Sequence, residues 1–242
     1  TLYLAENDTT DPGRGVLGIY HWVNGQLQFS DEISTHGIEP HQFVWLPGNT
    51  GFAIANGGIR TEAGSRSALD EVIESSLVLM NKNGILLSKE TLSAGNSIRH
   101  IATATDGTLV TAQQFTPTKQ HTTPTLLAIK KPGALLQPFF IDPDIEQQLQ
   151  GYSASVAINS QQRCVAVTAP RGNRLLAWDI DTGNVLLDTA LRDCAGISNT
   201  NDGFIVSSGE IGCRNIHMAA AHSTITPLQL PAGGWDNHLT LI

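Results

Sequence analysis

Three histidines stand at similar points in the sequence, each at the start of a segment typical of a β-strand. His41 lies six residues before Pro47 and His100 six before Asp106 (47 − 41 = 106 − 100 = 6). His238 begins the apolar C-terminal segment in a similar context. Neutral imidazoles suit zinc, iron or copper. The spacing therefore predicts that His41, His100 and His238 share a metal site. The structural alternative is that each histidine anchors its own part of the fold.

Polar and charged residues accompany these histidines. The set that we expect to bind a ligand consists of Glu6, Asn7, Asn56, Arg99, Tyr152, Arg171, Asp193 and Glu210. The guanidinium groups of Arg99 and Arg171 suit carboxylate or phosphate, because they offer two parallel N–H donors. The alternative is an ion pair with one of the acidic residues Glu6, Asp193 or Glu210. No Gly-x-Ser-x-Gly, His-Glu-x-x-His or Cys-x-x-Cys motif occurs in the sequence, so no nucleophile is recognisable.

Two alternating series of tight turns must position these residues. The first consists of Asn24-Gly25, Asn83-Gly84, Pro132-Gly133 and Thr182-Gly183, and the second of Pro47-Gly48, Asp106-Gly107 and Asp202-Gly203. Each turn separates two runs of strand-forming residues, which is a hairpin signal. Two hairpin classes that recur about every 45 to 55 residues predict an all-β fold, a β-propeller of four-stranded blades. A β-sandwich is the less suitable alternative.

The expected blades form a single domain over residues 1–242. They lie near 1–35 plus 235–242, 41–94, 98–142, 152–190 and 194–230, with one short helical turn between 142 and 151. In a blade of antiparallel strands, the start of the first strand and the end of the second lie at the same edge. We therefore expect the candidate residues to surround one mouth of the central channel.

Composition and charge narrow the function. Lys and Arg number 14 against 22 Asp and Glu, which gives 14 − 22 = −8. An acidic chain without basic runs argues against binding to nucleic acid or to anionic membranes. No apolar run approaches the roughly 18 residues of a membrane span. Of the three cysteines, Cys194 and Cys213 flank one hairpin, so a disulfide and two free thiols are both open, whereas Cys164 is expected to be buried in a strand.

Several motifs together resemble one bacterial family. They are Ala5-Glu-Asn-Asp8, Gly13-Arg-Gly-Val-Leu-Gly-Ile-Tyr20, His36-Gly-Ile-Glu-Pro-His41, Ala55-Asn-Gly-Gly-Ile59, Ser97-Ile-Arg-His100, Ala169-Pro-Arg-Gly172 and Trp235-Asp-Asn-His238. In this order they resemble the "domain of unknown function 1513" family across nearly the whole chain. The resemblance implies an exported propeller of Gram-negative bacteria, usually seven-bladed. It also implies a periplasmic location and genes beside those of periplasmic iron-handling proteins. The chain would cover about five blades, with an N-terminal stretch of the family missing.

These observations predict a periplasmic binding or accessory protein. Its channel mouth would hold a metal, a metal chelate or small ligand, or the loop of a partner such as a periplasmic iron-handling protein. The first alternative is a metal-dependent propeller enzyme, a lactonase-like hydrolase or an oxidoreductase, whose metal would activate water or redox chemistry. A protein-binding scaffold is the second.

Overall fold

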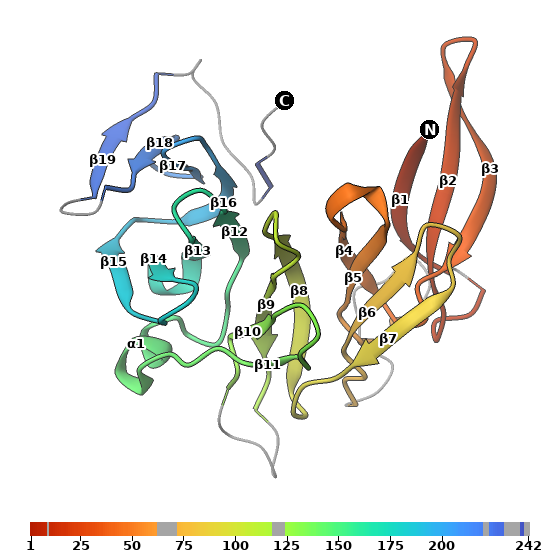
Figure 1. Ribbon diagram of the computed structural model, residues 1–242, viewed down its shortest axis with the longest axis horizontal. Helices are drawn as coiled ribbons and strands as arrows, with labels where there is room; N and C mark the ends of the chain where they lie inside the picture. The colour runs from red at the N-terminus through yellow and green to blue at the C-terminus, as the bar shows by residue number, and fades with distance from the viewer. Residues whose placement is uncertain (9, 62–71, 118–123, 220–222, 230–237, 240–242) are drawn as a thin grey trace.

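The computed structural model describes residues 1–8, 10–61, 72–117, 124–219, 223–229 and 238–239. In these residues antiparallel strands form five sheets, which follow one another in chain order along an arc (Figure 1). The first sheet has the order β1-β2-β3, and each of the other four has four strands. The all-β propeller expected from the turn pattern is confirmed.

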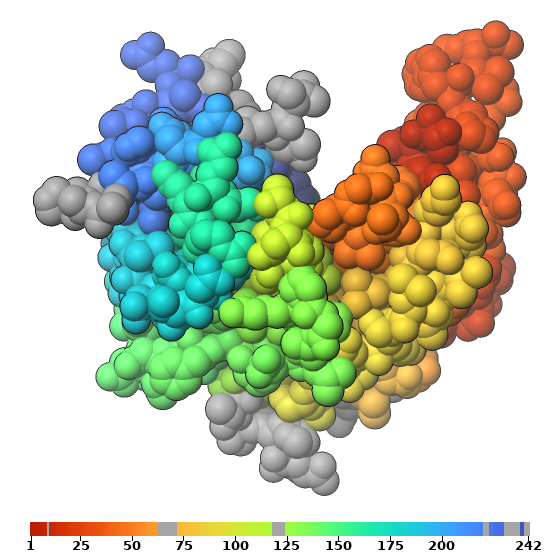
Figure 2. Space-filling model, viewed as in Figure 1, coloured from red at the N-terminus to blue at the C-terminus, as the bar shows by residue number. Residues whose placement is uncertain are grey.

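The strands of the first three sheets are short, apart from one long hairpin. The first sheet holds β1 (Leu2–Asn7), β2 (Gly15–Val23) and β3 (Gln26–Ser34). The second holds β4 (Pro40–Trp45), β5 (Gly51–Asn56), β6 (Ser76–Asn81) and β7 (Leu86–Glu90), and the third β8 (Asn96–Thr103), β9 (Leu109–Phe115), β10 (Leu127–Lys130) and β11 (Gln137–Pro138). The tip of the hairpin β2–β3 projects beyond the rest of the molecule (Figure 2), whereas the start of β2 is buried.

The last two sheets repeat the same pattern. They consist of β12 (Ser155–Asn159), β13 (Cys164–Ala169), β14 (Arg174–Asp179) and β15 (Val185–Ala190), and of β16 (Cys194–Asn199), β17 (Gly203–Ser208), β18 (Arg214–His217) and β19 (Thr224–Pro227). The first strands β4, β8, β12 and β16 contact one another in succession, so they form the inner side of the arc. Between the third and fourth sheets lies the expected short helix, α1 (Pro143–Gln148), whose first turn is capped by Asp142 through the N–H of Asp144.

The hydrophobic core lies between successive sheets because neighbouring residues of a strand point to opposite faces. In β5, Phe52 and Ile54 pack toward the first sheet, whereas Ala53 and Ala55 pack toward the third. In β14, Trp178 packs toward the third sheet, in the same cluster as β9 and β10. Alternation of apolar residues within a strand such as β5 therefore fills two interfaces at once, which explains why β5 is buried along its whole length.

The turns follow the predicted series with one difference. Asn24 and Gly25 both have positive φ, at 50° and 81°, as a two-residue hairpin turn of the mirror-image type requires. In the Asn83-Gly84 turn only Gly84, at 79°, has positive φ. The Asn83-Gly84 turn is therefore of a different type, and the side chain of Asn81 caps it by accepting hydrogen bonds from the N–H groups of Asn83 and Ile85.

Two further expectations concern the C-terminus and the cysteines. The strand expected at 235–242 lies mostly outside the described residues, and the described His238 and Leu239 belong to no strand. Cys164, Cys194 and Cys213 are all buried and free, so of the two alternatives for Cys194 and Cys213 the structure has free thiols. The Cys194 thiol instead lies 3.0 Å from the carbonyl oxygen of Arg174 in the preceding sheet. Among the described residues, no helix has the length and apolarity to cross a membrane.

Candidate functional site

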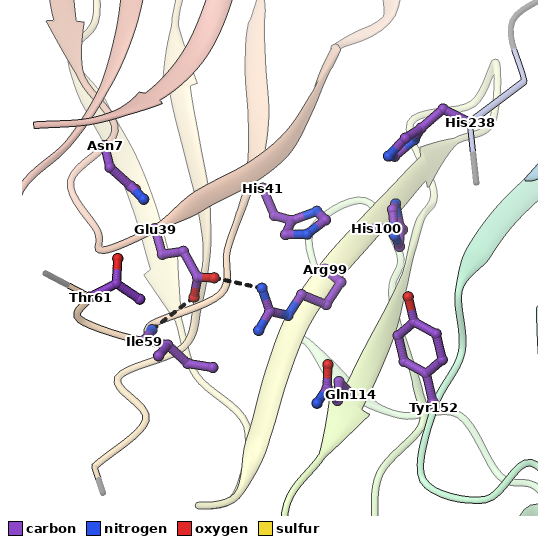
Figure 3. Close-up of a pocket in the computed structure, with 10 residues that line it drawn as sticks. All are labelled: Asn7, Glu39, His41, Ile59, Thr61, Arg99, His100, Gln114, Tyr152 and His238. Atoms are coloured by element: carbon purple, nitrogen blue, oxygen red, sulfur yellow. Dashed lines mark hydrogen bonds and ion pairs between the residues drawn. The ribbon is translucent and has the colours of Figure 1, made fainter. Parts of the chain in front are cut away.

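A cavity of about 590 Å³ lies where the starts of the first strands of the sheets meet the ends of the second strands. Figure 3 shows its lining, which consists of Asn7, Glu39, His41, Ile59, Thr61, Arg99, His100, Gln114, Tyr152 and His238. Segments of the first four sheets contribute, because Asn7 ends β1, His41 lies in β4, Arg99 and His100 lie in β8, and Tyr152 precedes β12. Six of the eleven residues expected at the channel mouth line this cavity.

The equivalence assumed for His41 and His100 is wrong by one residue. Trp45, which pairs with Phe52, and Thr103, which pairs with Leu109, are the last paired residues before their turns. His41 and Arg99 each lie four residues before them (45 − 41 = 103 − 99 = 4), so His41 corresponds to Arg99. The physical reason is the turn. The hydrogen bond from Leu46 to Gly51 encloses residues 47–50, whereas the bond from Ala104 to Thr108 encloses only 105–107. A count of residues back from the turn motif therefore matches each residue of β4 with a residue of β8 that is one position away from its true equivalent.

A β-bulge sits at this shared position in both sheets. The pairing of β4 with β5 skips His41, and the pairing of β8 with β9 skips Arg99. A bulge inserts one residue without a partner and redirects its side chain. For this reason Arg99 and His100 both line the cavity, although consecutive residues of a regular strand point to opposite faces.

Glu39 holds Arg99 in place, although it is not among the residues expected to bind a ligand. Its Oε1 accepts a hydrogen bond from Nη1 of Arg99 at 2.5 Å, and its Oε2 accepts one from the backbone N–H of Ile59 at 2.9 Å. Glu39 has a φ of 54°, an uncommon conformation for a residue with a side chain. Gly57 makes room for it, because a Cβ there would lie 2.6 Å from Oε2. The only available signal was the acidic residue before Pro40 and His41.

The imidazole ring of His100 contacts the rings of both His41 and His238. The centroids of His41 and His100 are 5.0 Å apart, and those of His100 and His238 are 5.2 Å apart. Nδ1 of His100 lies 3.1 Å from Oε1 of Gln42, the residue equivalent to His100 in the second sheet. The expectation that His41 and His100 share one rim is thereby met, and the contact with Gln42 links two neighbouring sheets.

Desolvation lowers the pKa of two of these rings below that of an ordinary histidine. Desolvation, with smaller contributions from His41, His238 and Arg99, lowers the pKa of His100 to about 3. Desolvation, with contributions from Arg99 and His238, lowers the pKa of His41 to about 4. His100 is only 3% exposed, whereas His41 is an exposed residue whose charge solvent screens, so the shift at His100 has the larger consequence. At neutral pH the charged groups of the lining are Arg99 and Glu39.

Comparison with known proteins identifies the family of this chain. The family model described as "Protein of unknown function (DUF1513)" matches residues 1–242. The chain belongs to the DUF1513 family. No curated protein matches this DUF1513 chain.

Among solved structures, the DUF1513 chain is similar to that of U3-55K, with a TM-score of 0.55 and 10% sequence identity. The match covers 77% of the DUF1513 chain and 51% of the other, so this chain spans about half of that structure's length. At this identity the likeness shows the fold alone, a β-propeller type.

The other five expected residues of this DUF1513 protein do not line the cavity. Glu6 accepts a hydrogen bond from the hydroxyl of Tyr20 at 2.7 Å, and Asn56 is buried and donates to the carbonyl of Thr35 at 3.3 Å. Arg171 lies 4.6 Å from the centre of the Tyr152 ring.

Asp193 and Glu210 lie just outside the strands of the last sheet and do not line the cavity. The backbone N–H of Asp193 donates to Oδ1 of Asn173 at 2.9 Å, and Glu210 pairs with Arg192 at 2.6 Å. The ion pairs considered for Arg99 with Glu6, Asp193 or Glu210 are wrong, because Arg99 pairs with Glu39.

A metal site at the histidines can be tested against the geometry. Among the described residues, no group of three His, Cys, Asp or Glu side chains is arranged to hold a metal ion. His41, His100 and His238 therefore do not form such a group, although the ring of His100 contacts the other two. Gln114 and Thr61 add further hydrogen-bonding groups to the lining, so the cavity presents mostly polar, uncharged donors and acceptors around one ion pair.

Proposed function

We propose that this DUF1513 protein is a binding or accessory propeller whose channel-mouth cavity receives a small polar ligand. A single observation carries the proposal. Side chains from four different sheets converge on one cavity of about 590 Å³, a size within the range of small-molecule sites. The polar lining supplies several fixed hydrogen-bonding groups, which is what orientation of a bound molecule needs.

Binding is favoured over catalysis because Glu39, the only carboxylate among the described residues of the lining, is already occupied. Both oxygens of Glu39 accept hydrogen bonds, one from Arg99 and one from Ile59, so Glu39 serves to position Arg99 rather than to take a proton. Export to the periplasm and a role beside iron-handling proteins belong to the same proposal, and their support is the family resemblance.

A blocked cavity tests the proposal. Thr61→Trp would fill the cavity, and Thr226→Trp, on an exposed position of β19, is the matched control. We would incubate the three proteins with a small-molecule extract, wash them and identify retained compounds by mass spectrometry. A compound retained by the wild type and Thr226→Trp but not by Thr61→Trp supports the proposal. Retention of no compound, or equal retention by all three, would refute it.

A metal-dependent enzyme is the second candidate, and one observation favours it. His41 and His100 are held unprotonated, which is the state in which imidazole binds metals. Elemental analysis of native, untagged protein tests this candidate. A stoichiometric metal that is lost in a His41→Ala/His100→Ala variant would support it, and the same trace metal content in both proteins would exclude it.

A further inference from the structure

The guanidinium group of Arg99 has one occupied edge and one free edge. Nη1 donates to Glu39, and this pair is well shielded, with 13% of the Arg99 side chain and 16% of the Glu39 side chain exposed. On the other edge, Nε is buried and has no hydrogen-bond partner in the described part of the chain. A buried N–H without a partner is costly, and in native proteins it calls for an explanation.

Three features fix the position of Arg99 in the cavity. The bulge of β8 turns Arg99 out of the regular alternation, Glu39 adopts a φ of 54°, and Gly57 leaves space for the Glu39 carboxylate. Backbone strain of this kind is found at sites where a side chain must be held for binding. The Glu39 carboxylate binds Arg99 through Nη1, so it forms no hydrogen bond with the Nε edge.

The free edge has the geometry of an oxyanion site. Nε and Nη2 of a guanidinium are parallel donors whose spacing matches the two oxygens of a carboxylate or phosphate. In Figure 3, Arg99 lies between Glu39 and the imidazole rings, and Gln114 and Tyr152 lie on the other side of the same cavity. The net charge of the chain, −8, repels anions at long range, so an oxyanion here must be bound by local contacts.

We propose that the ligand of this cavity carries an oxyanion group, a carboxylate or a phosphate, which binds to the Nε–Nη2 edge of Arg99 after a small movement of the side chains that cover Nε. This inference rests on the proposed function and names the chemical class of its ligand. Glu39 neutralises Arg99 on one side and orients it, and the oxyanion replaces the partner that Nε lacks. The lining polar groups then recognise the rest of the molecule.

The test observes Arg99 directly. The Nε–H signal of Arg99 in ¹⁵N-labelled protein is assigned by its loss in Arg99→Lys, a variant that keeps the charge but lacks the two parallel donors. Citrate and pyrophosphate are then titrated separately, so that the carboxylate and phosphate arms are distinguished. We expect one of them to shift the Arg99 signal and to bind about 10- to 100-fold more weakly to Arg99→Lys.

Arg192→Lys is the control, because Arg192 is an exposed arginine that is also paired with a carboxylate, that of Glu210. It should bind the anion as the wild type does. Unchanged Arg99 signals with both anions, or equal binding by Arg99→Lys and wild type, would overturn the inference. If a compound from the cavity-blocking experiment binds without moving the Arg99 signal, the oxyanion inference fails and the proposed function stands. If that experiment also retains nothing, both fail.

Discussion

Replacing His100 by glutamine tests whether burial holds this imidazole neutral. The ring is 3% exposed, touches His41 and His238, and lies beside Arg99. Its pKa is about 3 in the folded protein, against 6.5 for an ordinary histidine. Between these values the unfolded chain binds a proton that the folded protein does not. The contribution of His100 to stability is therefore complete above about pH 6.5 and is lost as the pH falls toward 3.

The magnitude follows from the proton binding of the unfolded state. From about pH 7.5 to about pH 5, the proton-binding factor 1 + 10^(pKa − pH) of an unfolded histidine with a pKa near 6.5 rises roughly 30-fold, which stabilises the unfolded state by about 2 kcal/mol. This value does not depend on whether the folded pKa is 3 or 4. The lowered pKa of His41 arises from burial, Arg99 and His238, so it persists when His100 is replaced.

Urea denaturation at the two pH values measures the effect. The free energy of unfolding of the wild type should fall by about 2 kcal/mol more than that of His100→Gln over this interval. His21→Gln, at an exposed position of β2, is the control and should behave as the wild type. If His100→Gln and wild type lose the same stability between the two pH values, the imidazole is not held neutral by burial.

Three further predictions concern packing and thiols. Gly57→Ala should lower stability by about 1–3 kcal/mol by urea denaturation, because its Cβ meets the Glu39 carboxylate at 2.6 Å; no loss would show that the carboxylate moves freely. Trp178→Ala should cost about 3–5 kcal/mol, whereas Trp22→Ala, at a residue 70% exposed, should change stability little; equal effects would contradict the assigned core. Protein unfolded without reductant should show three reactive thiols, and native protein should react slowly because burial raises the pKa of Cys194 to about 11; only one thiol after unfolding would indicate a disulfide.

The sequence determined the architecture because its signals are local. Glycine turns and alternating apolar residues specify hairpins, and hairpins of two alternating classes specify four-stranded sheets. The edge of each sheet at which His41, Arg99 and His100 lie also follows, because antiparallel connectivity places the start of each first strand at one edge. Those parts of the prediction needed no knowledge of how the sheets pack.

Tertiary structure decided which side chains meet. A one-residue difference in turn length made His41 equivalent to Arg99, and the bulges that turn both residues into the cavity depend on pairing across the sheet. The contact of Glu39 with Arg99 joins residues 60 positions apart in sequence. Such partners are chosen by the packing of one sheet against the next, which spacing along the chain does not encode. The same packing buries the Nε of Arg99 and leaves it without a partner.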